Sequence, residues 1–126
     1  MGMKIREFSV ECHCGNIKLF SNDFPGSITS CNCSICHRLG ALWAYYDSEK
    51  VKVQVGDKSV DTYTWGEKSI TYHRCGECGC TTHYTTVETN GDKIIAINCR
   101  MASSSLTDKI PVRQFDGLLT WKYQDA

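Results

Sequence analysis

The sequence predicts a mainly β domain in which the helices are no longer than single turns. Short segments alternate apolar and polar residues along most of the chain. Turns rich in glycine, proline, asparagine and aspartate separate these segments, and no apolar periodicity reaches the length of an ordinary helix. The chain has 126 residues, the size of one domain with one core, so we expect residues 1–126 to form a single domain.

The N-terminal part of the chain reads as strands joined by turns. Alternation favours strands at residues 4–11, 16–20 and 28–31. The first two flank Cys12-His13-Cys14-Gly15, where glycine allows the backbone to turn tightly. Residues 37–40 predict a helical turn that Gly40 ends, and the apolar run at 41–46 predicts another strand.

The middle and the C-terminal part continue in the same way. Val51, Val53 and Val55 alternate with polar residues and predict a half-buried strand. Further strands are expected at 60–65, 69–74, 81–87 and 94–97, with Asn90-Gly91 as a hairpin turn. Residues 102–106 predict one helical turn, whereas 111–115 and 118–121 are short elements whose type the pattern leaves open.

Composition argues against two classes of partner. The formal net charge is zero, whereas nucleic-acid binders normally carry a basic excess or patch. The apolar runs span only a few residues, too short for a membrane-spanning helix. The N-terminal residues lack the apolar segment of a secretory signal, so we expect a cytoplasmic protein.

Nine cysteines are the unusual feature of the composition. An odd number leaves at least one thiol unpaired in any disulfide scheme. In a reducing compartment thiols stay free, and clustered thiols there act as metal ligands or catalysts. We therefore interpret the clusters as zinc sites.

Two of the three clusters complete one another. Cys12 and Cys14 form one pair, Cys75 and Cys78 form another, and each pair lies on a turn that contains glycine. Neither pair fills a tetrahedron, but together they supply the four sulfurs of a closed structural zinc site. Such an ion would close a long loop of the chain and should therefore contribute to stability.

The third cluster, Cys31, Cys33 and Cys36, is left with three ligands. Three protein ligands and an open position are typical of a catalytic zinc site. The alternative is a structural zinc completed by a fourth protein ligand, for which the candidates are Cys80, Cys99, His37 and His73. Cys99 also reads as an inert core thiol and Cys80 as a redox or packing thiol, while His37 and Arg38 either meet an anionic substrate or lie in a solvated turn.

These motifs resemble one known family. They are Cys12-x-Cys14-Gly15, then Cys31-Asn32-Cys33-Ser34-x-Cys36 followed by Arg38 and Gly40, and Cys75-x-x-Cys78-Gly79. Their order is similar to that of the glutathione-dependent formaldehyde-activating enzyme family, which also contains centromere protein V. The stretch 63–80 and Ile97-Asn98-Cys99-Arg100 extend the likeness, which runs from about Ser9 to Met101.

The resemblance implies a β-tent-type fold, in which two small antiparallel sheets carry zinc knuckles. It implies two Zn²⁺ per chain: a structural ion at Cys12, Cys14, Cys75 and Cys78, and a second ion at Cys31, Cys33 and Cys36. At the second ion glutathione would be activated to add to formaldehyde, the reaction of a carbon–sulfur lyase of the S-(hydroxymethyl)glutathione synthase type. The partners would then be a small-molecule thiol and an aldehyde. The alternative is a non-catalytic zinc-binding module that binds another protein.

Overall fold

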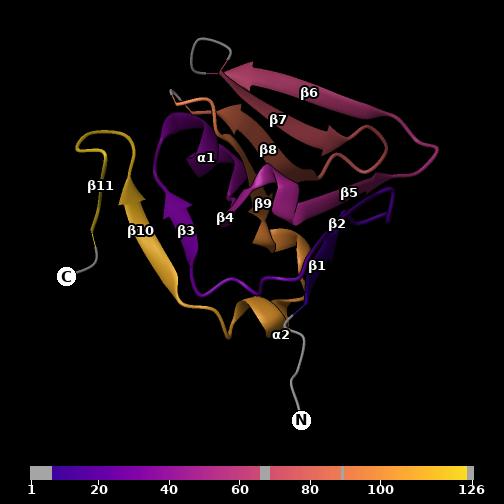
Figure 1. Ribbon diagram of the computed structural model, residues 1–126, viewed down its shortest axis with the longest axis horizontal. Helices are drawn as coiled ribbons and strands as arrows, with labels where there is room; N and C mark the ends of the chain where they lie inside the picture. The colour runs from indigo at the N-terminus through magenta and orange to yellow at the C-terminus, as the bar shows by residue number, and fades with distance from the viewer. Residues whose placement is uncertain (1–6, 66–68, 89, 125–126) are drawn as a thin grey trace.

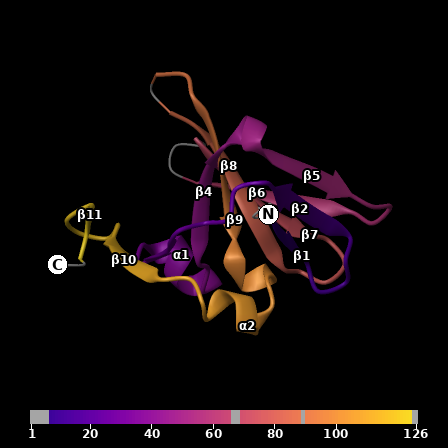
Figure 2. The ribbon, with the colours of Figure 1, turned by 60° about the horizontal axis from the view of Figure 1, so that its bottom comes forward.

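The protein consists of two β-sheets that share one hydrophobic core (Figure 1, Figure 2). The computed structural model describes residues 7–65, 69–88 and 90–124. The small sheet has the strand order β1-β2-β5 and is antiparallel throughout. Its strands are β1 (Phe8–Glu11), β2 (Ile17–Ser21) and β5 (Val51–Val55).

The large sheet has the strand order β11-β10-β3-β4-β9-β8-β7-β6. Neighbouring strands are antiparallel except β3 and β10, which run parallel. These strands are β3 (Ile28–Cys31), β4 (Trp43–Asp47), β6 (Val60–Trp65), β7 (Ile70–Cys75), β8 (Thr81–Val87), β9 (Lys93–Asn98), β10 (Val112–Asp116) and β11 (Lys122–Tyr123).

The helices of the described chain are short, as expected. They are α1 (Ser34–Leu39), α2 (Ser104–Thr107) and the 3-10 turns η1 (Ser48–Lys50) and η2 (Cys99–Met101). Gly40 ends α1 with φ 65°, in the left-handed region that glycine tolerates. The mainly β class with two sheets is thereby confirmed. The sheets are unequal, because the segment after α2 adds β10 and β11 beside β3 and extends the large sheet.

The prediction for residues 51–55 is correct in strand type and wrong in burial. Val53 and Val55 are 39% and 52% exposed, and only Val51 packs against the core. The buried side chains of the small sheet come from β1 and β2, so β5 extends that sheet beyond the part that packs against the core. Alternation along an edge strand therefore does not ensure that one of its faces is covered.

The large sheet is apolar on both faces. One face packs against the small sheet, where Tyr46, Ile95 and Ile97 join Phe8, Val10, Ile17 and Leu19 in the main core. On the other face Trp43 and Ala96 belong to a second buried cluster with Tyr72, Cys36 and Ala41. Trp43 and Tyr46, or Ala96 and Ile97, lie on opposite faces because successive residues of a strand alternate. The second cluster is where the candidate site lies.

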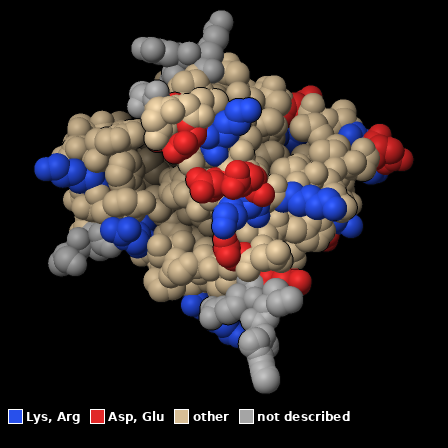
Figure 3. All heavy atoms as spheres, in the orientation of Figure 1, with Lys and Arg blue, Asp and Glu red and all other residues tan. Residues whose placement is uncertain are grey.

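Charges of both signs are mixed on the face of the molecule shown in Figure 3, where acidic and basic side chains lie side by side. That face presents no continuous basic surface for a polyanion. In the described part of the chain, no helix has the length and apolar character needed to cross a membrane.

The cross-strand pair Leu19 and Val53 tests this arrangement. Leu19 is fully buried, so Leu19→Ala should lower the free energy of unfolding by about 2–5 kcal/mol. Val53 is exposed, so Val53→Ala should cost less than about 1 kcal/mol. Urea unfolding at a fixed zinc concentration measures both. Equal costs for the two variants would contradict the buried position of Leu19 and the exposed position of Val53 on the same face of the small sheet.

Candidate metal centres

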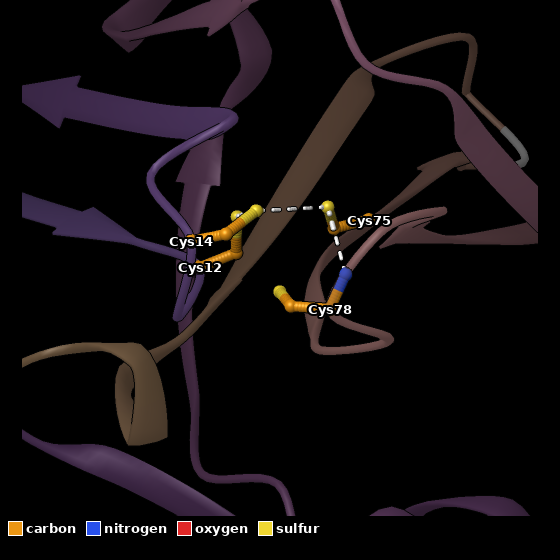
Figure 4. A group of neighbouring side chains, drawn as sticks. All are labelled: Cys12, Cys14, Cys75 and Cys78. Carbon is orange, nitrogen blue, oxygen red and sulfur yellow. Dashed lines mark hydrogen bonds between the residues drawn. The ribbon is translucent and has the colours of Figure 1, made fainter.

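The first cluster lies where the two sheets meet (Figure 4). The turn between β1 and β2 carries Cys12 and Cys14, whereas Cys75 ends β7 and Cys78 lies in the turn between β7 and β8. The Sγ atom of Cys14 lies 3.8 Å from that of Cys12 and 3.5 Å from that of Cys75, and all four sulfurs lie within 4.8 Å of one another. Four thiolates at the usual Zn–S distance stand about 3.8 Å apart at the corners of a tetrahedron. The donor set therefore fits a zinc ion.

Backbone amides surround these sulfurs. The amide of Ile17 donates to Cys12 Sγ at 3.3 Å, and the amides of Glu77 and Cys78 donate to Cys75 Sγ at 3.3 and 3.4 Å. Gly15 and Gly79, with φ 83° and 80°, supply the left-handed residues of the two turns.

The amides favour the thiolate form of Cys75 and Cys78. At Cys14 the Asn16 amide lowers the pKa, but desolvation and the neighbouring thiols raise it to about 11. The Cys78 amide is the main cause of the lowered pKa of Cys75. Desolvation raises the pKa of Cys78, but the amides of Cys80 and Cys14, together with the neighbouring thiols, bring it down to about 6. Since the thiolate is the form that binds metal, these hydrogen bonds suit Cys75 and Cys78 to that role.

The second cluster lies on the other face of the large sheet. Cys31 ends β3, Cys33 is the residue before α1, and Cys36 lies inside α1. Their Sγ atoms also lie within 4.8 Å of one another. Among the described residues, no fourth Cys, His, Asp or Glu joins this group. Three sulfurs fit three corners of a zinc tetrahedron and leave one corner without a protein ligand.

The sulfur of Cys36 has hydrogen-bond donors on two strands of the large sheet, β4 and β7. Trp43 Nε1 donates to it at 3.3 Å, and the Tyr72 hydroxyl is also within hydrogen-bonding reach. Burial raises the pKa of Cys36 to about 12. A bound cation is what would keep such a buried thiol ionised at neutral pH, so its surroundings also fit a metal.

Residues 116–121, which are the last residue of β10 and the loop that follows it, are attached to the second cluster by a pair of polar side chains. Asn32 Nδ2 donates to Asp116 Oδ1 at 3.0 Å, and Asn32 Oδ1 accepts from the Leu118 amide at 3.0 Å. Asp116 also accepts from the amides of Leu119 and Thr120. These hydrogen bonds lower the pKa of Asp116 to about 2. The bond from Asn32 contributes most, and the Leu119 amide comes second.

Gly117 follows Asp116, and the close approach of the loop to Cys31 explains why this residue is glycine. A Cβ atom on Gly117 would lie 2.7 Å from Cys31 Sγ, so a side chain there would displace the sulfur. At the end of the loop Trp121 adopts φ 61°, a conformation that costs a bulky residue energy. Its amide donates to the Asp116 carbonyl at 2.6 Å, which helps to hold it there.

A cavity of about 580 Å³ opens beside the second cluster. Cys31, Cys33 and Cys36 form part of its wall. Half of the other lining residues are aromatic: Tyr45, Trp65, Tyr72, Tyr84, Phe115, Trp121 and Tyr123. Tyr72 and Tyr84 belong to the second buried cluster with Trp43, on the face of the large sheet that points away from the main core. The three sulfurs thus lie in the wall of a cavity that a small molecule can enter.

None of the four candidates for a further ligand joins the group of Cys31, Cys33 and Cys36. Cys99 is fully buried in the main core, and Cys80 lies beside Cys78 of the first cluster. His73 stacks on His83 at 4.3 Å between ring centroids and bonds Thr85 Oγ1 at 3.1 Å. His37 is exposed and does not line the large cavity, and the same holds for Arg38.

Sequence reasoning missed the polar residues that position the two clusters. Asn32 and Asp116 lie far apart in the sequence, so no local pattern pairs them. The dipeptide Asp116-Gly117 is a turn signal that could have marked the loop. Asn16 was missed as well; its Nδ2 donates to the Lys58 carbonyl at 3.1 Å and lies 3.8 Å from Cys75 Sγ.

Comparison with known proteins agrees with this geometry. The family model described as glutathione-dependent formaldehyde-activating enzyme matches residues 7–113. A crystal structure of a Rhodobacter sphaeroides protein is similar with a TM-score of 0.66 and 22% identity, and the match covers 83% of this chain and 99% of that one. At this identity the structural likeness supports the fold alone. Because the family model spans most of the sequence and includes all seven clustered cysteines, the chain belongs to the glutathione-dependent formaldehyde-activating enzyme family.

Proposed function

We propose that this chain is a zinc-dependent enzyme of the carbon–sulfur lyase type, similar to S-(hydroxymethyl)glutathione synthase. It would add a low-molecular-weight thiol, glutathione in the description of its family, to a small aldehyde such as formaldehyde. The observation that carries the proposal is the cluster of Cys31, Cys33 and Cys36 in the wall of a cavity, with no fourth ligand among the described residues.

The two clusters would have different roles. Cys12, Cys14, Cys75 and Cys78 would hold a structural zinc that joins the sheets, whereas Cys31, Cys33 and Cys36 would hold the reactive one. A zinc ion with an open position lowers the pKa of a thiol that binds it and so supplies the thiolate nucleophile.

The tyrosines of the cavity can assist the second part of the reaction, in which the carbonyl oxygen takes up a proton. When the thiolate sulfur bonds to the carbonyl carbon, the carbonyl oxygen gains negative charge and takes up a proton. Burial raises the pKa of Tyr45, Tyr72 and Tyr84, so these hydroxyls stay protonated at neutral pH. Protonated hydroxyls in the cavity wall can donate hydrogen bonds to that oxygen.

The alternative, a zinc module that binds another protein, predicts a completed second cluster and an apolar surface patch away from it. The exposed apolar residues of the C-terminal loop include Leu118 and Trp121, 61% and 71% exposed. Both line the cavity beside the cysteines. Their position fits the mouth of a substrate site better than a separate docking surface.

The proposed reaction predicts a defect in Cys33→Ser. This variant should lower the enzymatic rate of thiol–formaldehyde adduct formation about 100-fold or more, because the nucleophile would lose its metal site. Exchange spectroscopy by NMR measures the rate above the uncatalysed reaction. Cys80→Ser, which alters a thiol outside both clusters, should keep its activity. Wild-type activity in Cys33→Ser would refute the assignment of the active site.

The first cluster should account for one metal ion and for much of the stability. Wild-type protein should bind two zinc ions, and Cys75→Ser one, with a loss of stability measured by thermal unfolding. Cys33→Ser should also bind one ion but unfold closer to the wild-type temperature. Two ions in Cys75→Ser would show that this thiol is no ligand.

Trp43→Phe tests the hydrogen bond to Cys36. Removal of the indole N–H should weaken zinc binding at the second cluster about tenfold, because donors to a ligand orient it and tune its charge. Competition with a chromophoric chelator measures the affinity, and the first cluster of the same protein is the internal control. Equal weakening at both clusters would point to general destabilisation instead.

A further inference from the structure

The cavity beside the second cluster lacks the charges that glutathione needs. Glutathione carries two carboxylates, which proteins bind with arginine, lysine or clustered amides. Among the described lining residues none is lysine or arginine, and the one carboxylate is that of Glu88. Three thiolates around a divalent cation add a further negative charge. An anionic peptide would therefore meet like charge and no described cation in this cavity.

Two arginines on elements that contribute to the cavity, Arg113 on β10 and Arg38 in α1, make contacts outside it. Arg113 lies over the ring of Tyr123, with its guanidinium carbon 3.7 Å from the ring centroid. Arg38, in α1, donates to the Ser34 carbonyl at 2.9 Å. Neither residue lines the cavity.

Aromatic rings form two walls of the cavity. The sheet wall carries Tyr45 on β4, Tyr72 on β7 and Tyr84 on β8, with centroids of Tyr72 and Tyr84 5.2 Å apart. The other wall, called the loop wall, carries Phe115 on β10 and Trp121 in the loop that follows it. Their rings meet edge to face at 5.1 Å. Rigid aromatic walls give apolar contact area at a low cost in conformational entropy.

The loop wall is built at an energetic cost. Trp121 has the only left-handed non-glycine backbone among the described residues. The hydrogen bonds of Asp116 hold the loop against the cysteine segment, so that the strained residue lines the cavity. Strain of this kind is found where a binding site requires it.

We propose that the thiol used by this enzyme carries an uncharged aromatic or apolar body, which the aromatic walls bind, and no carboxylate. This inference rests on the proposed function and narrows its substrate class. The reaction is otherwise unchanged: the sulfur–carbon bond forms, the carbonyl π bond breaks, and the oxygen takes the proton that the thiol releases. No oxidant or reductant is needed.

Three thiols test the preference with the zinc-loaded full chain. Benzyl mercaptan has the predicted body, 4-(mercaptomethyl)benzoate adds one carboxylate to it, and glutathione is the anionic peptide. Isothermal titration calorimetry should show benzyl mercaptan binding at least about tenfold more tightly than either of the others, a difference that reflects one unpaired charge. Equal or tighter binding of the benzoate or of glutathione would overturn the proposal.

Two variants locate the preference in the cavity. Trp65→Ala should weaken benzyl mercaptan binding about tenfold, whereas Phe20→Ala, an exposed aromatic on the small sheet, should leave it unchanged. Glu88→Lys should reduce the difference in affinity between benzyl mercaptan and the benzoate, or reverse it. An unchanged preference in both Trp65→Ala and Glu88→Lys would place binding outside this cavity and refute the inference.

The activity assay separates this inference from the function on which it rests. Selective binding of benzyl mercaptan without turnover of any thiol and aldehyde would refute the proposed function and leave the preference of the cavity intact. Turnover of glutathione that benzyl mercaptan neither replaces nor inhibits would refute the inference and support the function.

Discussion

The alternation of side chains across the eight-stranded sheet is the constraint on which the rest of the structure depends. Because neighbouring residues of a strand point to opposite faces, β4 and β9 supply Tyr46 and Ile97 to the main core and Trp43 and Ala96 to the site. A shift of one residue in the register of either strand would exchange the two sets. Core packing thus fixes the positions of the aromatic residues around the cysteines.

The site also depends on contacts between distant parts of the sequence. The parallel pairing of β10 with β3 brings residues 116–121 beside the cysteine segment, and Asn32 with Asp116 fixes the distance between them. Gly117 then allows the loop to approach Cys31 without displacing its sulfur. The C-terminal strands therefore complete the cavity rather than only extending the sheet.

The sequence was sufficient to predict the strands as far as β9, the shortness of the helices and the grouping of the cysteines, because alternation, glycine turns and ligand spacing are local signals. It left the type of the segments that form β10 and β11 open. It could not predict the exposure of Val53 or the parallel pairing of β10, because both follow from the order of strands in a sheet. The aromatic cavity was also beyond reach, since Trp65, Tyr84 and Trp121 meet only through that order. Zinc binding and the thiol substrate stay predictions.

The most direct test of the account is the coordination of zinc in the wild-type protein, measured by X-ray absorption at the zinc edge. One closed and one open site predict an average of about 3.5 sulfur neighbours per zinc, with the remainder oxygen or nitrogen. Addition of benzyl mercaptan should raise that average to about 4 as the thiolate occupies the open position. Four sulfur neighbours before any thiol is added, or an average that no thiol changes, would contradict an open reactive site at Cys31, Cys33 and Cys36.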